Sequence, residues 1–567
     1  MKANNAYLES WKILTEATSE ISKVYVDLSF NVLGNPKVAN RIRKNFFNYS
    51  KSNFEITKRM FYRNFNGKYA PVIDPLNGDK RFNSEEWEKY PYYFDFVKQH
   101  YLLFSQFILS SVNEAELKEK SKLKLSFYTS QIINALSPSN FLLTNPAAIK
   151  LAQQTKGQSL VEGFKNLMSD IKKGHISQTD ESAFEIGKNL ACTKGAVVYE
   201  NELIQLIQYS PLTESVCEYP MLMIPPWINK FYILDLHSER SMVEYALLQG
   251  QTIFIISWRN PSEKMNHFTF NDYANLGSLK AIEVIQKITK AKKINALGYC
   301  LGGTLLGITL AILKSKNNNI INSATFLAAM LDFSDIGPMK AIIDESLVKK
   351  IELEFKNNGM LMGRDLAKAF NALRPNDLVW YYIINNYLEG KKPLPFSVLY
   401  WTNDNTNLPG RMYTYYLRKM LLENKLSQKK ALTICDVPID LSTIDTPSYV
   451  IGTIEDHIAP CRTAFATTEL LGGPVEFVLG DSGHIMGSIN APSKKNKYHH
   501  HINGQLGEGF EQWKKTAKLS DGSWWPHWMN WLKQKSGKQI QAREELGNKN
   551  FPEIEPAPGR YVMERIY

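Results

Sequence analysis

The sequence predicts an α/β protein in which a mostly parallel β-sheet is covered by helices on both faces and preceded by a mostly helical domain. Two patterns support this prediction. The first 180 residues carry apolar side chains at helical spacing, whereas beyond them short β-branched and aromatic runs alternate with helical segments, which is typical of a parallel sheet. At 567 residues the chain exceeds one typical domain. We therefore expect a helical domain over residues 1–180 and an α/β domain over residues 181–567.

Two helices are expected in the N-terminal domain. The Asn145-Pro146 pair is a helix-start signal and predicts a helix over residues 147–173. An amphipathic helix is predicted over residues 94–111, because apolar side chains recur there at the spacing of one helix face: Phe94, Val97, Tyr101, Phe104 and Ile108.

The segment Met1–Arg63 is basic and rich in aromatic residues. It carries 11 Lys/Arg against 5 Asp/Glu, a local excess of +6. Such a segment forms either a solvated helix face or a helix that lies on an amphiphilic surface. The aromatic residues interleaved with these charges include Trp11, Tyr25, Phe46, Phe47, Tyr49, Phe54, Phe61 and Tyr62.

The α/β domain contains a series of predicted strands. A helix is expected over residues 276–289, and residues 332–445, which show no clear strand period, are interpreted as a helical cap inserted over the active site. The strands are expected at Ala196–Tyr199, Leu203–Tyr209, Met221–Ile224, Thr252–Trp258, Ile294–Tyr299, Ser323–Leu331, Pro447–Gly452 and Val475–Leu479.

The motif Gly298-Tyr299-Cys300-Leu301-Gly302 lies between a predicted strand and a predicted helix. It matches the nucleophile elbow of the α/β-hydrolase fold, with cysteine in the place usually taken by serine. Small residues on either side let the strand and helix pass closely, and the helix N-terminus favours a thiolate. We therefore predict Cys300 as the nucleophile and the Leu301 N–H as an oxyanion donor. The alternative is a buried structural cysteine.

A cysteine nucleophile needs a base and an orienting acid. In this fold they follow in the order nucleophile, acid, histidine, each on a loop after a strand. Asp456 and His484 match that order and are the predicted partners of Cys300. The competing candidates are His457 as the base and Glu455 or Asp481 as the orienting acid.

Composition and charge argue against several classes of protein, namely nucleic-acid-binding, secreted, membrane-spanning and zinc-binding proteins. The net charge of +11 comes without a nucleic-acid-binding signature, and neither a signal peptide nor a membrane-spanning run is evident. Five scattered cysteines without a CxxC pair suit a reducing cytoplasm and no zinc site. The run His499-His500-His501 is interpreted as a solvated loop, so no metal is expected.

Four tryptophans near the C-terminus are expected mainly in the core, and the alternative is that they line an apolar exit path for the product: Trp524, Trp525, Trp528 and Trp531.

Several blocks, from roughly Asp79 to Tyr561, resemble the polyhydroxyalkanoate synthases. The blocks are GYCLGGT around Cys300, PPWINK from Pro225, SWRNP from Ser257, LRPNDLVW from Leu373, YWTNDNTNLP from Tyr400, EDHIAP from Glu455, SGHIMGSIN from Ser482 and GSWWPHW from Gly522.

The resemblance implies a single-subunit, class I type enzyme that polymerises (R)-3-hydroxyacyl-CoA, chiefly 3-hydroxybutyryl-CoA, and releases CoA. Cys300 would hold the growing chain as a thioester, His484 would take its proton, and Asp456 would orient His484 or help activate the 3-hydroxyl group. A second oxyanion donor would come from the Trp227–Ile228 turn. No cofactor is implied.

The expected setting is the cytoplasm and the polyester granule surface, with a homodimer and granule-coat proteins as partners. Because CoA is a phosphate-rich anion, binding of CoA is one explanation for the net positive charge of the chain. The rival hypotheses are a cysteine-triad acyl-CoA thioesterase and a non-catalytic granule-associated protein.

Overall fold

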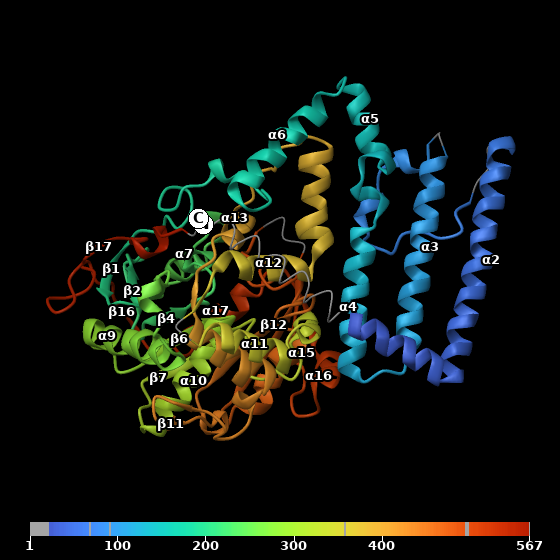
Figure 1. The fold of residues 1–567 in the computed structure, drawn as a ribbon. Helices are drawn as coiled ribbons and strands as arrows, with labels where there is room; N and C mark the ends of the chain where they lie inside the picture. Colours follow the sequence, from blue (N-terminus) through green and yellow to red (C-terminus); the bar gives the residue numbers. More distant parts are fainter. Residues whose placement is uncertain (1–21, 67–69, 90–91, 357–358, 494–497, 566–567) are drawn as a thin grey trace. The chain divides into compact units, whose positions relative to one another are not determined.

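The computed structural model describes residues 22–66, 70–89, 92–356, 359–493 and 498–565. These residues form two compact units (Figure 1). The first comprises the described part of Met1–Gln178 with Lys340–Ile342 and Phe370–Leu394, and the second comprises Thr179–Met339, Ile343–Ala369 and the described part of Pro395–Tyr567. Parts of the predicted cap insertion therefore belong to each unit.

The first unit is built on three long helices that lie side by side: α2 (Pro36–Asn66), α3 (Tyr93–Glu114) and α4 (Glu119–Ala135) (Figure 1). The helix predicted over residues 94–111 is confirmed as α3. An ion pair between Arg63 of α2 and Asp95 of α3, 3.2 Å long, joins two of these helices where both side chains are nearly buried. Lys98 also approaches Asp95, at 3.1 Å.

The helix predicted over residues 147–173 is two helices, α5 (Pro146–Gln154) and α6 (Gln158–Lys173). The predicted start is confirmed, because the Asn145 side chain accepts a hydrogen bond from the Ala148 N–H. The prediction of one helix was wrong because Lys156 and Gly157 adopt left-handed backbone angles, with φ of 52° and 84°. Such angles end a right-handed helix.

The second unit contains an eleven-stranded mixed sheet in the order β15-β14-β13-β12-β7-β6-β4-β5-β2-β1-β17. The prediction of a mostly parallel sheet holds for its centre, from β5 to β13, whereas antiparallel strands extend both ends. The main strands are β1 (Gly195–Glu200), β2 (Ile204–Tyr209), β4 (Met221–Ile224), β5 (Ile253–Trp258), β6 (Ile294–Tyr299), β7 (Ile321–Leu327), β12 (Ser448–Thr453) and β13 (Val475–Gly480).

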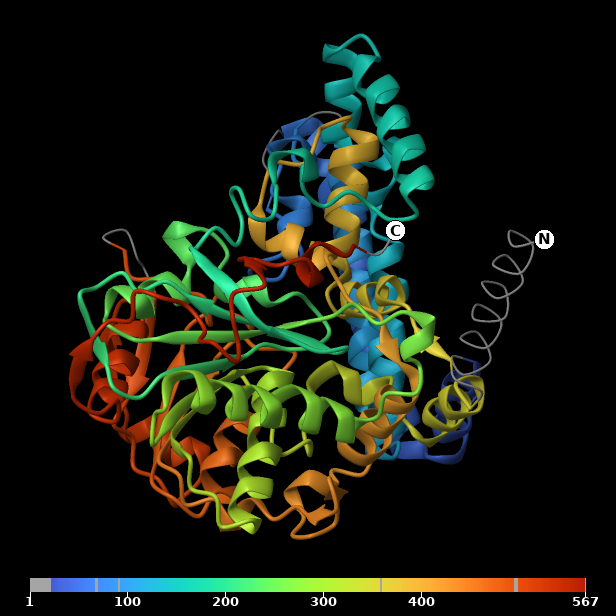
Figure 2. The same cartoon turned by 90° about the vertical axis from the view of Figure 1, so that its left-hand side faces the viewer.

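Alternate residues of the central strands enter two separate cores, as the two-residue period of a strand requires. Phe254 and Ile256 of β5 pack on one face, with helices α9 (Lys280–Thr289), α10 (Leu301–Ser315) and α15 (Cys461–Leu470). Ile253 and Ile255 pack on the other, with α7 (Met242–Leu248) and α17 (Trp525–Lys533). The helices therefore cover both faces of the sheet (Figure 2).

Two further expectations concern the C-terminal third. The histidine run is not a loop, because His499–Ile502 forms strand β14 between β13 and β15 (Lys518–Asp521). Strand pairing outweighs the weak strand preference of histidine there. Trp524, Trp525 and Trp528 are confirmed as core residues, each at most 1% exposed.

The basic N-terminal segment is helical over residues 22–34 and along α2. Trp11 lies outside the described residues. Five of the aromatic rings on α2 are exposed rather than packed inward: Phe46, Phe47, Phe54, Phe61 and Tyr62. In the part of the chain that the structure describes, no helix is long and apolar enough to cross a bilayer.

Candidate active site

Cys300 lies on a sharp turn between β6 and α10. Its backbone φ is 53° and ψ is −123°, a strained conformation for a residue with a side chain. The turn is held because the Cys300 N–H donates a hydrogen bond to the Leu327 carbonyl, 2.9 Å away on β7. A Cβ on Gly298 would collide with the backbone of Gly302 and Gly303, so the close passage of strand and helix requires glycine. This geometry is that of a nucleophile elbow.

The elbow also contacts the loop that follows β4. A side chain at Gly302 would collide with the Ile224 carbonyl, so glycine allows this loop to lie against the start of α10. The loop's Trp227 and Ile228 carbonyls accept hydrogen bonds from the Thr406 hydroxyl and N–H, which hold the loop in place. Within the described residues the N–H groups of Leu301, Trp227 and Ile228 donate no hydrogen bond to the protein. They are therefore suited to stabilise an oxyanion beside Cys300.

Asp456 and His484 form a buried pair at the carboxyl ends of β12 and β13. The His484 Nδ1 atom lies 2.7 Å from Asp456 Oδ2. The other carboxylate oxygen, Oδ1, accepts hydrogen bonds from the Ile458 and Ala459 N–H groups, both at 2.8 Å. Two backbone donors and one imidazole thus fix the carboxylate, which in turn fixes the orientation of the ring.

The Cys300 thiol interacts with the His484 ring. Burial alone would lower the pKa of His484, but the charges of Asp456 and Cys300, together with hydrogen bonds to both, raise it well above 6.5. An imidazole held against Cys300 is placed to take the thiol proton when the sulfur attacks a thioester. Tyr299 stacks on the ring, with centroids 5.5 Å apart, and restricts its tilt.

The competing acids take other positions. Asp481 Oδ2 accepts the His499 N–H at 2.8 Å and so anchors β14, and the Glu455 side chain is exposed to solvent. His457 is half-buried on the loop that carries Asp456, and Asp456 Oδ2 contacts His484 rather than His457. The structure therefore brings together Cys300, Asp456 and His484.

One residue near Cys300 was not predicted from the sequence. Tyr416 packs edge-on against Trp227, with ring centroids 6.4 Å apart, and reaches Cys300 from the predicted cap insertion. Burial, followed by the charge of Cys300, raises the pKa of Tyr416 well above 10, so its hydroxyl stays protonated. Only the tyrosine-rich stretch Tyr413–Tyr416 could have drawn attention to it.

Lys230 is a second residue that the sequence did not single out. It is 2% exposed and follows directly on the loop that carries Trp227 and Ile228. Its Nζ donates hydrogen bonds to the carbonyls of Glu564 at 2.6 Å and Tyr561 at 3.4 Å, and its own carbonyl accepts the Trp401 indole N–H at 2.7 Å. The C-terminal segment thereby holds the loop beside the elbow in place.

The described residues contain no group of three or more His, Cys, Asp or Glu side chains placed to hold a metal ion. What the site does contain is a thiol, an imidazole held by a carboxylate, and backbone N–H groups that donate no hydrogen bond to the described part of the protein. This set is suited to acyl transfer through a cysteine thioester.

Two known families match this chain. Residues 78–246 match the family described as the N-terminus of poly-beta-hydroxybutyrate polymerase, and residues 219–488 match the alpha/beta hydrolase fold. The second match agrees with the observed sheet and elbow.

Three curated relatives align with most of the chain. The poly(3-hydroxyalkanoate) polymerase subunit PhaC of Cupriavidus necator is 45% identical over 87% of this chain and 84% of its own. The poly(3-hydroxyalkanoate) polymerase of Methylorubrum extorquens is 41% identical over 87% and 82%. Polymerase 2 of Ectopseudomonas oleovorans is 38% identical over 87% and 88%.

Proposed function

Because the chain belongs to the poly(3-hydroxyalkanoate) polymerase family, we propose that it polymerises (R)-3-hydroxyacyl-CoA into polyester and releases CoA. The expected monomer is 3-hydroxybutyryl-CoA, and the expected type is the single-subunit class I. The observation that carries the proposal is the buried Asp456–His484 pair at 2.7 Å, with the ring of His484 against the thiol of Cys300.

The first step loads Cys300. His484 holds the thiol proton, and the Cys300 sulfur attacks the carbonyl carbon of the acyl-CoA thioester. The oxygen becomes an anion that the N–H groups of Leu301 and of the Trp227–Ile228 turn can stabilise. The bond to the CoA sulfur then breaks, and CoA leaves with the proton from His484. The result is an acyl group on Cys300 and free CoA.

The second step lengthens the chain. The 3-hydroxyl group of another monomer gives its proton to His484 and attacks the thioester carbonyl carbon on Cys300. An ester bond forms, and the Cys300 thiolate leaves, so the lengthened chain is carried by the incoming CoA. Repetition of the first step returns it to Cys300 and frees that CoA. Asp456 keeps His484 in the orientation that both proton transfers need.

A thiol nucleophile suits this cycle, because exchange between two thioesters costs little free energy. The buried, apolar surroundings of Cys300, which packs against both hydrophobic cores, restrict access of water to the acyl enzyme. These features support polymerisation over hydrolysis.

The test uses purified full-length protein and 3-hydroxybutyryl-CoA. Released CoA and turbidity from insoluble polymer are followed together, with Cys300→Ala as the control. Polymer formed in step with CoA release supports the proposal. Release of CoA with soluble 3-hydroxybutyrate would identify a thioesterase instead, and no CoA release at all would favour a non-catalytic granule-associated protein.

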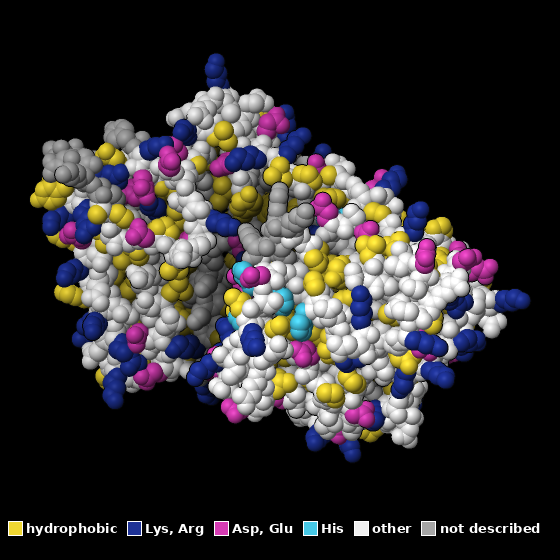
Figure 3. Space-filling view, turned by 180° about the vertical axis from the view of Figure 1, so that it is seen from behind, with side chains coloured by type: hydrophobic (Ala, Val, Ile, Leu, Met, Phe, Trp, Pro, Cys, Tyr) yellow, Lys and Arg dark blue, Asp and Glu magenta, His cyan; other side chains and the backbone are white. Residues whose placement is uncertain are grey.

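The exposed rings of α2 support a role at the granule surface, where we expect the protein to work. They alternate with Lys and Arg, as in Lys51, Lys58 and Arg59, and hydrophobic and basic side chains interleave across the surface shown in Figure 3. Rings can enter an apolar polymer surface while the basic side chains keep their charges in water. Homodimer contacts and granule-coat proteins are the competing uses of these rings.

A further inference from the structure

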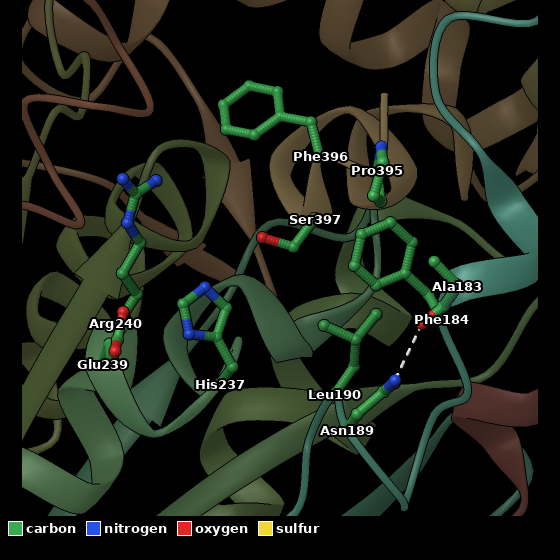
Figure 4. Close-up of a pocket in the computed structure, with 10 residues that line it drawn as sticks. All are labelled: Ala183, Phe184, Asn189, Leu190, His237, Glu239, Arg240, Pro395, Phe396 and Ser397. Atoms are coloured by element: carbon green, nitrogen blue, oxygen red, sulfur yellow. Dashed lines mark hydrogen bonds between the residues drawn. The ribbon is translucent and has the colours of Figure 1, made fainter. Parts of the chain in front are cut away.

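A pocket of about 440 Å³ lies within the second unit (Figure 4). Its walls come from three separate segments: residues 183–190, residues 237–240 just before α7, and residues 395–397 at the start of α13 (Ser397–Asn403). None of these residues takes part in the acyl-transfer steps described above, so the chemistry at Cys300 leaves the pocket unexplained.

One part of the pocket is apolar. Phe184, Leu190 and Phe396 line it, and Phe184 is held in place by packing against Tyr400, with ring centroids 5.1 Å apart. Asn189 contributes no free polar group, because its side chain donates to the Ala183 carbonyl at 2.8 Å and accepts the Glu185 N–H at 2.7 Å. This wall is suited to alkyl groups.

The other part carries hydrogen-bond donors that the protein leaves unused. Among the described residues, neither the His237 imidazole nor the Ser397 hydroxyl has a side-chain hydrogen bond, and Arg240 makes no ion pair within 4 Å. The guanidinium donates only to the Met486 sulfur, a weak acceptor, at 3.6 Å. In Figure 4 the Ser397 hydroxyl and the His237 ring face the same hollow, with Arg240 on one side and Phe184 on the other.

The charges of this region favour a neutral ligand. Arg240 and Glu239 are adjacent and of opposite sign, so their charges nearly cancel. Burial, followed by the charge of Arg240, lowers the pKa of His237 below 6.5, so that its ring is neutral at pH 7. A phosphate dianion would be attracted by Arg240 but repelled by the adjacent Glu239 carboxylate, so this region is poorly suited to bind phosphate. An uncharged molecule rich in acceptor oxygens would satisfy all three donors.

We propose that this pocket binds a segment of the growing polyester chain, with ester carbonyl oxygens accepting hydrogen bonds from Arg240, Ser397 and His237 and with alkyl groups against Phe184 and Phe396. A polyester has acceptors but no donors between its ends, which matches the unused donors of Arg240, Ser397 and His237; the carboxylate of the lining, Glu239, is exposed to solvent. This inference rests on the proposed polymerase function.

Arg240 of the pocket contacts Met486, a residue of the loop that carries His484. That residue lies two positions after His484 on the same loop, and its sulfur is the group that Arg240 contacts. A chain bound in the pocket therefore lies against the loop that carries the proposed base. Binding there would keep the chain on the enzyme between transfers, when it is carried by CoA rather than by Cys300.

The experiment measures binding without turnover. The full-length Cys300→Ala protein is titrated calorimetrically with the uncharged methyl ester of a (R)-3-hydroxybutyrate tetramer, and separately with CoA. Ser397→Ala and Arg240→Met are added singly to this background. The matched controls are Ser334→Ala, an exposed hydroxyl, and Arg462→Met, an exposed guanidinium 60% accessible to solvent. Thermal unfolding verifies that each variant is folded.

Each pocket variant should weaken tetramer binding by roughly 5- to 10-fold, the effect of one lost hydrogen bond. The controls should leave tetramer binding unchanged, and all variants should bind CoA alike. Unchanged tetramer binding in Ser397→Ala and Arg240→Met would overturn the inference. Loss of CoA binding with intact tetramer binding would also overturn it and would assign the pocket to phosphates. Because Cys300 is absent, either result is independent of whether the protein polymerises.

Discussion

His484 Nδ1 lies 2.7 Å from Asp456 Oδ2, and two backbone N–H groups hold the opposite oxygen of the same carboxylate. The carboxylate has no freedom to turn away from the ring. Replacing it by an amide would keep the size of the side chain but place an N–H₂ group or a neutral oxygen where the charge stood. The charge of Asp456 is also the leading cause that raises the pKa of His484.

Asp456→Asn should retain slow loading of Cys300, because His484 stays in place, but should lower turnover by roughly 10² or more. Steady-state CoA release from 3-hydroxybutyryl-CoA measures this effect. Glu455→Gln and Asp481→Asn are the matched controls and should do much less, since neither carboxylate contacts His484. Similar losses in all three variants would contradict the assignment of Asp456.

His484 should make folding stability depend on pH. Its folded pKa lies above 6.5, so protonation of the folded state contributes stability below pH 6.5, and that contribution is lost as pH rises through the raised pKa. The wild type should therefore exceed His484→Gln in unfolding free energy by more at pH 6 than at pH 9. Urea unfolding of both proteins at the two pH values measures this. A difference that grows with pH would contradict the raised pKa.

Lys230→Met should loosen the C-terminal segment and slow catalysis. Methionine fills similar space but leaves the Glu564 and Tyr561 carbonyls without their buried donor, which costs about 1–3 kcal/mol. Hydrogen exchange should rise in residues 559–565 and in the loop that carries Trp227 and Ile228. Turnover should fall more than KM changes, because the oxyanion donors are displaced. The control is Lys349→Met, whose side chain is 66% exposed; equal effects in both variants would exclude a positioning role for Lys230.

Exposed rings of α2 should govern attachment to granules. Deleting residues 1–63 would also remove Val38 and Ile56, which are buried, so substitution is the cleaner change. Phe47→Ser, Phe54→Ser and Phe61→Ser together should lower co-sedimentation with isolated granules by about tenfold or more and lengthen the lag before polymerisation, while loading of Cys300 continues.

The control for this variant is Leu353→Ser with Leu519→Ser, two exposed apolar residues of the second unit. Equal partitioning of the ring variant and the wild type would rule out the surface role. Normal partitioning combined with a change from dimer to monomer in solution would assign the rings to a contact between copies of the chain.

Much of the α/β unit could be predicted from local patterns. The elbow could be predicted because close backbone contacts require glycine at Gly298 and Gly302. The strands at the centre of the sheet could be predicted because they are mostly apolar runs. The order of Cys300, Asp456 and His484 along the chain was sufficient to select the residues that the structure brings together. Whether they act as proposed stays a prediction.

The features that were not predicted depend on contacts between segments far apart in the chain, and the pattern of a single sequence does not reveal such contacts. Lys230 is paired with carbonyls more than 300 residues away, and the pocket donors Arg240 and Ser397 come from separate segments. The break at Lys156 was missed because a left-handed lysine gives no compositional signal, unlike the glycine that follows it. The histidine strand was missed because pairing with neighbouring strands, not propensity, places it in the sheet.

The central claim is that Cys300 carries the acyl chain. Rapid quenching of the enzyme with 3-hydroxybutyryl-CoA, followed by digestion and mass spectrometry, measures this directly. The peptide containing Cys300 should carry one or more hydroxybutyryl units in a bond that hydroxylamine cleaves, and Cys300→Ala should carry none and release no CoA. Cys300→Ser should load poorly, because a hydroxyl is far less acidic than a thiol. Polymer formed at the wild-type rate by Cys300→Ala, or acyl groups on another residue, would contradict the account.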